Sequence, residues 1–290
     1  MNDQRIVTPE GYSHKPVWFR ALNTAWRGAY VVGAKANLKK DHLIQMARKE
    51  TGLREFGADF WEEPLDRLLD AIEKEADLHP IGRFITQQRM KGLLATRLRA
   101  EELFRKKPEI LEQELYPVQL ICGLQRTGTT KLQRLLSGDT DNRVLYSWEA
   151  LSPVPLNDQP NEMTARIKAA RMSEQALRLM SPGFFSIHPV EYQKPEEDIL
   201  LLDTTFMSTT PEATMHVPSY AALATLGLNS SRALEETNAC IRSRTAEGLS
   251  PRTMPMTPWR IISQIRPSFL LRMPSLPAIG RNSMFAANAP

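Results

Sequence analysis

The chain has 290 residues, 42% of them hydrophobic and 24% charged, with a formal net charge of +4. This composition indicates a globular protein of one large domain or two small ones, and its two cysteines, Cys122 and Cys240, give neither a disulfide framework nor a metal-ligand spacing. Because no run reaches the roughly 18 apolar residues of a membrane span and the first residues lack a secretory signal, we expect a cytoplasmic protein without a membrane span or a metal.

The positive charge lies at one end of the sequence. Residues 223–290 hold eight arginines and three glutamates, a balance of +5, which leaves −1 of the total of +4 for residues 1–222. A protein that follows a nucleic-acid backbone needs a basic face on its folded part. We therefore expect no nucleic-acid binding.

Residues 1–112 are predicted to form a helical N-terminal region. Asp41 is a candidate cap for a helix that ends at Gly52, and Pro64–Ala76 carries the apolar stripe of a surface helix. A long basic helix is predicted from Ile81 to Lys106. Its arginines and lysines are interpreted as a solvated face, with a partner surface as the alternative. The stripe consists of Leu65, Leu68, Leu69 and Ile72.

A glycine-bounded loop is the most informative feature of the chain. Val118–Cys122 is predicted to be a short apolar strand, which leads into a loop between Gly123 and Gly128 and then into an amphipathic helix. Such a loop directs backbone N–H groups to the positive end of a helix dipole, where phosphate or sulfate can bind. The glycine spacing matches a P-loop, but Thr129 stands where the lysine would be, and the cation is Arg126 instead.

Further elements follow the loop. Gly138 ends the loop helix, Arg143–Trp148 is predicted to be a second buried strand, and Asn161–Met180 is predicted to be helical. Pro195–Leu202 is predicted to be a helix with proline at its first position and acids in its first turn. A strand, a loop, a helix and a second strand in this order favour an α/β fold with a parallel sheet.

The loop sequence Gly-Leu-Gln-Arg-Thr-Gly-Thr-Thr, from Gly123 to Thr130, resembles the R-[ST]-G-T-T loop of bacterial sulfotransferases that use 3′-phosphoadenosine-5′-phosphosulfate (PAPS). The resemblance runs from about Gly52 to Ala222 and includes Trp148–Pro153, His188 and Pro195–Asp198. It implies a P-loop-like sulfotransferase fold, with the α/β core in residues 113–222. It also implies transfer of a sulfuryl group from PAPS, as co-substrate, to a hydroxyl of a small-molecule acceptor.

The resemblance assigns roles to individual residues. Arg126 would neutralise charge on the donor, since a guanidinium stays protonated and fits tetrahedral oxyanions. Glu149 would be the base that takes the acceptor's proton, with His188 as the alternative base. Glu149 could instead pair with Arg126 or cap a turn, and the acids at 196–198 are interpreted as helix-start charges. The residues expected to hold the phosphosulfate are Gly123, Arg126, Thr127, Gly128, Thr129, Thr130 and Lys131.

Residues 223–290 differ from the rest. They contain no Lys-Ser-Pro or His-Arg-Asp-Pro block, on which such sulfotransferases bind the 3′-phosphate of PAPS, and they hold seven prolines and eight arginines. Out-of-frame translation, or a disordered or diverged tail, would give this bias. We therefore expect a sheet that is incomplete at its C-terminal side and little or no turnover by the 290-residue chain. The alternative functions are a P-loop kinase or NTPase, and an inactive sulfotransferase relic that binds partners.

Overall fold

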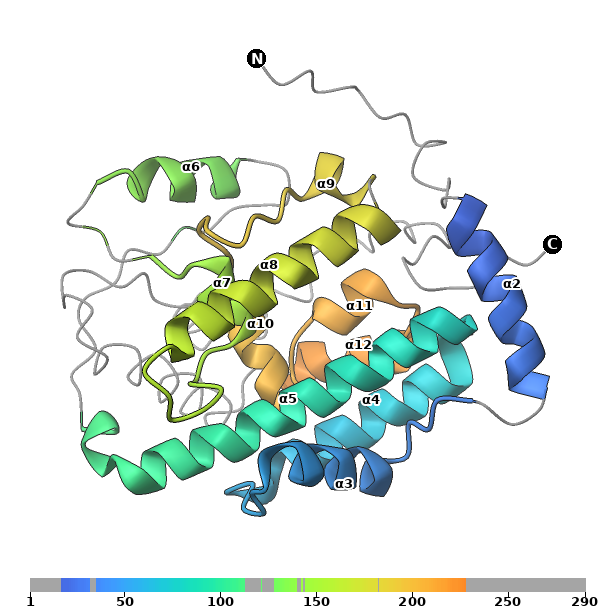
Figure 1. Cartoon of the computed structure of the whole chain (residues 1–290), viewed down its shortest axis with the longest axis horizontal. Coiled ribbons are helices and arrows are strands. Elements are labelled where there is room, and N and C mark those ends of the chain that lie inside the picture. Colours follow the sequence, from blue (N-terminus) through green and yellow to red (C-terminus); the bar gives the residue numbers. More distant parts are fainter. Residues whose placement is uncertain are drawn as a thin grey trace.

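The structure is a computed structural model, and it describes residues 17–31, 35–112, 121, 128–139, 142, 144–181 and 183–227. Over these ranges it is helical (Figure 1). The α-helices are α2 (Val17–Val31), α3 (Lys40–Thr51), α4 (Glu62–Glu75), α5 (Pro80–Lys106), α6 (Thr129–Leu136), α7 (Ser147–Leu151), α8 (Glu162–Met180), α9 (Phe184–Ile187), α10 (Ile199–Leu202), α11 (Thr210–Thr214) and α12 (Pro218–Gly227). The 3-10 helices are η1 (Asp59–Trp61), η2 (Pro108–Ile110) and η3 (Asp203–Thr205).

The N-terminal helices form where the sequence predicts them. Helix α3 ends at Gly52, which adopts a left-handed conformation with φ of 72° and donates its N–H to the carbonyl of Arg48. The apolar stripe of α4 is buried, and α5 spans the whole of the predicted basic helix. The predicted cap is wrong by two residues, because Lys39 is the N-cap of α3 and Asp41 lies in its first turn.

One hydrophobic core holds α3, α4 and α5 together. Leu43, Leu65 and Leu94 are completely buried in it. It also contains Phe206 and Tyr220, so the core includes residues from both sides of the expected boundary at residue 112. The long helix α5 packs against α3, and α4 joins it through the ion pair between Glu73 and Arg83 (Figure 1).

The basic character of α5 is not a solvated face throughout. The guanidinium of Arg97 is buried and donates to the carbonyl oxygens of Thr204 and Phe56, at 3.1 Å each. Arg83 is also buried, and it pairs with Glu73 of α4. Buried guanidinium groups need partners in this way because an unpaired internal charge is very unfavourable.

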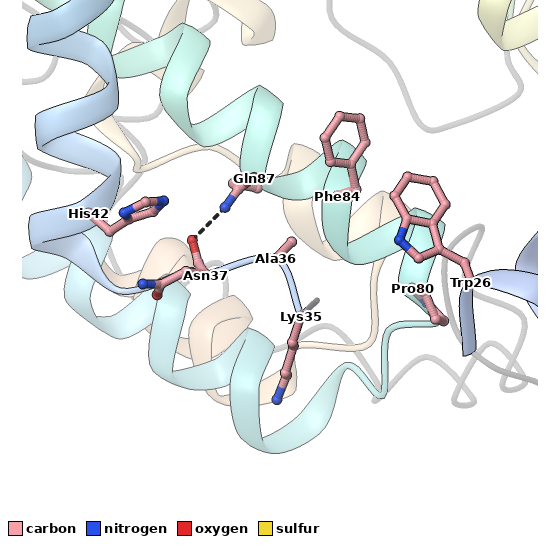
Figure 2. A pocket seen from close by; sticks show the side chains of 8 residues that line it. All are labelled: Trp26, Lys35, Ala36, Asn37, His42, Pro80, Phe84 and Gln87. Atoms are coloured by element: carbon pink, nitrogen blue, oxygen red, sulfur yellow. Dashed lines mark hydrogen bonds between the residues drawn. The ribbon is translucent and has the colours of Figure 1, made fainter. Parts of the chain in front are cut away.

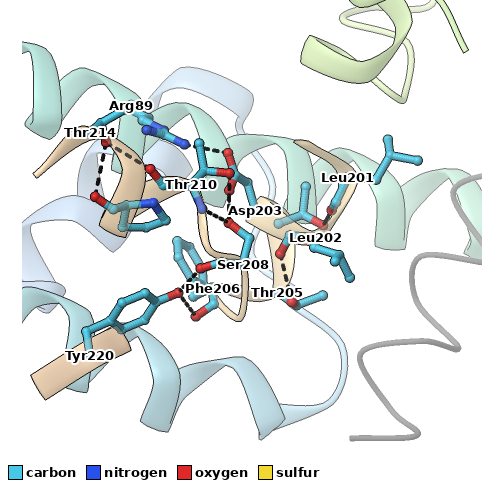
Figure 3. Close-up of polar contacts among 12 residues, drawn as sticks. Arg89, Leu201, Leu202, Asp203, Thr205, Phe206, Ser208, Thr210, Thr214 and Tyr220 are labelled. Atoms are coloured by element: carbon cyan, nitrogen blue, oxygen red, sulfur yellow. Dashed lines mark hydrogen bonds and ion pairs between the residues drawn. The ribbon is translucent and has the colours of Figure 1, made fainter. Parts of the chain in front are cut away.

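A polar cluster fixes the turn after α10 against α5 (Figure 3). Arg89 of α5 forms an ion pair with Asp203 at 2.5 Å, and the second carboxylate oxygen of Asp203 accepts a hydrogen bond from Ser208. The hydroxyl of Tyr220 donates at 2.9 Å to the carbonyls of Phe206 and Ser208. Burial raises the pKa of the Tyr220 phenol, which keeps it a donor.

Two predicted elements beyond the loop are wrong in part. Of the strand expected at 143–148, the described backbone is extended only up to Tyr146, because Ser147 starts α7. The helix expected from Pro195 begins only at Ile199. Pro195 instead forms an isolated antiparallel bridge with Tyr146, so it pairs with a distant segment where the first turn of a helix was expected.

The predicted parallel sheet is not seen in the described ranges, which contain no β-strand. The strand expected at Val118–Cys122 lies outside them except for Ile121. None of the described helices is both long enough and apolar enough to cross a lipid bilayer.

Candidate functional site

The structure describes the C-terminal part of the predicted anion loop. Gly128 is the N-cap of α6 and has a left-handed conformation, with φ of 97°. Thr129 and Thr130 follow in the first turn and are half-buried, and Lys131 is exposed. The first N–H groups of a helix have no partner within it, so this end of α6 can donate to an anion. Gly123, Arg126 and Thr127 lie outside the described residues.

Helix α6 is held by polar contacts. None of its residues is buried, and Leu135 is 67% exposed. The amide of Gln133 donates to the carbonyl of Glu196 at 3.0 Å. The guanidinium of Arg134 donates to Glu191 at 3.1 Å and to the carbonyl of Pro189 at 2.9 Å. The helix that follows the loop is therefore attached to both ends of the segment 189–196.

The same segment also pairs with the start of α7. The N–H of Trp148 donates to the carbonyl of Tyr192 at 3.0 Å, and the N–H of Ser147 donates to that of Lys194 at 2.9 Å. The N–H of Glu196 donates to the carbonyl of Leu145 at 2.9 Å. These bonds bring together the three parts of the chain that carry the predicted site residues: α6, residues 144–149 and residues 188–198.

Glu149 lies inside this arrangement. Its side chain is 1% exposed, and its Oε2 accepts the backbone N–H of Tyr146 at 2.8 Å. This is the reciprocal half of a capping box at the start of α7. Of the interpretations of Glu149, the structure therefore shows the cap, and it places the carboxylate away from solvent.

His188 has a different environment. Its side chain is 33% exposed, and its Nε2 lies 3.3 Å from Oε1 of Glu196, whose side chain is 8% exposed. The hydrogen bond from Glu196 raises the pKa of His188 above its usual value of 6.5, while burial opposes the rise. The ring also lies beside that of Phe184, with centroids 5.9 Å apart.

Glu196 is not the helix-start acid that the sequence predicts. It is buried and bound to His188. Its Oε1 also accepts the N–H of Glu197 at 3.0 Å. The sequence carries no signal for the pair, because the two residues meet only after the chain between them has turned back on itself.

Asp198 is a second acid of this region, and its side chain is half-buried. Burial raises its pKa to about 6, and its Oδ2 is buried without a hydrogen-bond partner in the part of the chain that the structure describes. No group of three or more potential metal ligands occurs among the described residues.

A cavity of about 310 Å³ lies elsewhere, between α2, the segment before α3, and α5 (Figure 2). The amide of Gln87 donates to the carbonyl of Asn37 at its wall. In Figure 1, α2 and α6 lie at opposite sides of the molecule, and no predicted site residue lines this cavity. Its lining residues are Trp26, Lys35, Ala36, Asn37, His42, Pro80, Phe84 and Gln87.

Comparison with known proteins bears on this arrangement. A family model described as "Sulfotransferase family" matches residues 117–262, about half of the chain. The match includes the loop and all three predicted catalytic residues, and it passes residue 222, so the likeness extends further than the sequence analysis expected. No curated protein matches the chain.

Two solved structures are similar to this one. Sulfotransferase STF1 from Mycobacterium tuberculosis H37Rv is 26% identical with a TM-score of 0.62, and the likeness covers 78% of this chain and 62% of that one. Sulfotransferase STF9 from Mycobacterium avium is 22% identical with a TM-score of 0.62, covers 76% of this chain and 57% of that one, and shows a shared fold. The chain thus spans less than two thirds of the length of either protein. Because the family model matches about half of the chain, the chain belongs to the sulfotransferase family.

Proposed function

We propose that this chain transfers a sulfuryl group from PAPS to a hydroxyl of a small-molecule acceptor. The observation that carries the proposal is the loop that ends at Gly128, since it combines a sulfotransferase-type sequence with a left-handed glycine that opens α6. Membership of the sulfotransferase family supports the reaction class. No metal takes part in the proposed reaction.

The donor is bound by the loop in this proposal. Backbone N–H groups from Thr127 to Lys131 bind the phosphosulfate, and the hydroxyls of Thr129 and Thr130 add hydrogen bonds. Gly123, at the start of the loop, also belongs to this proposed donor site. Arg126 neutralises the charge that develops on the oxygen bridging sulfur and the 5′-phosphate.

The reaction is a single displacement at sulfur. The acceptor oxygen forms a bond to sulfur, the bond between sulfur and the bridging oxygen breaks, and 3′-phosphoadenosine-5′-phosphate (PAP) leaves. The acceptor's proton passes to a base. We assign His188 as that base, because its ring is one-third exposed, whereas Glu149 is buried in a backbone cap.

Donor binding is the first test, because residues 223–290 lack the expected 3′-phosphate blocks and turnover is expected to be low. We would titrate the chain calorimetrically with PAP, and separately with ATP plus Mg²⁺. The proposal predicts binding of PAP. ATP binding in preference to PAP would establish the kinase or NTPase alternative, and binding of neither would indicate the inactive relic.

The role of Arg126 is tested with a variant. Loss of one charge-assisted contact is worth about 1.5–3 kcal/mol, so Arg126→Ala should weaken PAP binding roughly 10–150-fold. Arg105→Ala is the matched control, since Arg105 is 69% exposed and pairs with Glu102 at the end of α5. Equal PAP affinity for Arg126→Ala and the control would remove Arg126 from the donor site.

A further inference from the structure

The pair formed by His188 and Glu196 has a defined hydrogen-bonding sense. A carboxylate only accepts hydrogen bonds, so the contact from Nε2 to Oε1 at 3.3 Å requires the proton on Nε2. In the neutral imidazole the lone pair then lies on Nδ1, for which the described residues provide no hydrogen-bond partner. Nδ1 is the atom left to accept a proton.

The carboxylate is itself held in place. Glu196 is buried, and its Oε1 also accepts the N–H of Glu197. Its backbone N–H is bonded to Leu145, and its carbonyl accepts from Gln133 of α6. A buried carboxylate with this many backbone restraints can fix the orientation of an imidazole, as second partners of functional histidines do.

Hydrogen bonds to α6 connect the pair of His188 and Glu196 to the helix that follows the donor loop. Gln133 and Arg134 lie one turn into the helix that Gly128 opens, and they bind the two ends of the segment that follows His188. Since α6 buries none of its residues, these polar contacts are what the described structure offers to set the distance between loop and imidazole.

We propose that Glu196 is the positioning residue for His188, fixing the Nε2–H tautomer so that Nδ1 faces the acceptor, and that Gln133 and Arg134 keep this pair in register with the donor loop. The inference rests on the proposed sulfuryl transfer and deepens it. Glu196 does not touch the substrate in this account. It acts through the imidazole.

The charges around His188 fix the direction of the expected titration. Glu196 raises the pKa of the imidazole most, Glu197 raises it further, and Arg134 of α6 lowers it, as burial does. Replacing Glu196 by a neutral residue removes the largest stabilisation of the imidazolium. The pKa of His188 should therefore fall in Glu196→Gln, and its proton should leave at a lower pH.

Nuclear magnetic resonance of the full chain with ¹⁵N-labelled histidine measures the tautomer and the pKa of His188, and it does not require turnover. The chain has five histidines, and His188→Gln identifies the signals of His188. We expect wild-type His188 to titrate above 6.5 and to carry its neutral proton on Nε2. A proton on Nδ1, or an unchanged pKa in Glu196→Gln, would overturn the proposal.

Glu197→Gln is the matched control, because it removes the same charge one residue away without removing a hydrogen bond to the ring. It should lower the pKa of His188 by less than Glu196→Gln does and should leave the tautomer as it is. If Glu196→Gln unfolds, Glu196→Asp retains the charge and should restore a raised pKa. An equal shift in Glu197→Gln and Glu196→Gln would reduce the role of Glu196 to a general field effect and overturn the proposal.

The coupling between the donor loop and the pair of His188 and Glu196 is tested by adding PAP. Binding should shift the His188 signals in the wild-type chain, and Arg134→Gln should lose that shift while still binding PAP. An undiminished shift in Arg134→Gln would overturn the coupling through α6. If PAP does not bind at all, the proposed function fails, whereas the tautomer and pKa of His188 in PAP-free protein still decide the role of Glu196.

Discussion

Glu149, Glu196 and Asp198 show how three carboxyl groups in one region of the chain acquire different chemistry. Glu149 accepts a backbone N–H and closes a helix turn, and Glu196 binds an imidazole. Asp198 is half-buried, and its Oδ2 is buried without a hydrogen-bond partner in the described structure. The side chains are nearly the same, so the partner and the solvent exposure set the role of each one.

Asp198 leads to a prediction on stability. Its pKa is raised to about 6 in the folded state, above the value of 3.8 for a solvated group, so the folded protein holds this proton more tightly than the unfolded chain does. Ionisation of Asp198 therefore destabilises the folded protein. This destabilisation is absent below pH 3.8, grows as the pH rises towards 6, and is complete above 6. Asp198→Asn should therefore raise the free energy of unfolding at pH 7.5 by about 2–3 kcal/mol, since a pKa displaced by one corresponds to about 1.4 kcal/mol.

Urea unfolding at pH 7.5 and at pH 4 would measure this difference. The gain should shrink towards zero at the lower pH, where both side chains are neutral. Glu63→Gln is the control, because Glu63 is 73% exposed and should change the free energy of unfolding little at either pH. A gain of the same size at both pH values would mean that the charge of Asp198 is not its cause.

At the scale of the element, α6 depends on the glycine that opens it. A side chain at Gly128 would meet no atom of the described residues within 4 Å, and the left-handed backbone, with φ of 97°, opposes a substitution. An L-residue in that conformation costs about 1–2 kcal/mol. Gly128→Ala should lower the free energy of unfolding by about that amount or reshape the loop, and PAP affinity should fall.

Gly92 of α5 provides the control for this effect. A side chain there also meets nothing within 4 Å in the part of the chain that the structure describes, but its backbone is that of an ordinary helix interior. Gly92→Ala should stabilise the protein by about 0.4–1 kcal/mol and leave PAP binding unchanged. Denaturation and calorimetry on the two variants would show opposite signs, and a stabilised Gly128→Ala with normal PAP affinity would contradict the role of the left-handed turn.

Helix α5 depends on a buried guanidinium. Arg97 bonds to the carbonyls of Thr204 in η3 and of Phe56 in the loop after α3, and its charge lies 5.3 Å from the ring centres of Phe60 and Trp61. Lysine cannot reproduce this fork, so Arg97→Lys should lower the free energy of unfolding by about 2–4 kcal/mol. Arg105→Lys, on the exposed end of the same helix, should stay within about 0.5 kcal/mol of the wild type in the same denaturation experiment. Similar losses for both variants would show that the internal bonds of Arg97 contribute little.

At the scale of the whole molecule, the N-terminal helices do not close their own core. Phe206, Met215, Val217 and Tyr220 fill it from the other end of the described chain. A fragment of residues 1–112 should therefore lack a cooperative thermal transition, although its circular dichroism should retain some helix. A fragment that unfolds cooperatively at the midpoint of the full chain would show that the later residues only cover an independent bundle.

The sequence by itself determined the helices whose signals are local. The apolar stripe of α4, the glycine that ends α3 and the full extent of α5 could all be predicted, because periodicity and capping act over a few residues. The helix that starts after Gly128 could be predicted for the same reason, whereas Gly123–Thr127 lie outside the described residues and the loop stays a prediction.

Only the tertiary structure decided how the distant parts meet. The bridge between Tyr146 and Pro195 converts an expected strand and an expected helix into a paired segment, and no local propensity encodes it. The same return of the chain brings Glu196 to His188. Hydrogen bonds between residues far apart in sequence depend on where the backbone turns, and that was fixed by the packing of the whole chain rather than by the residues on either side.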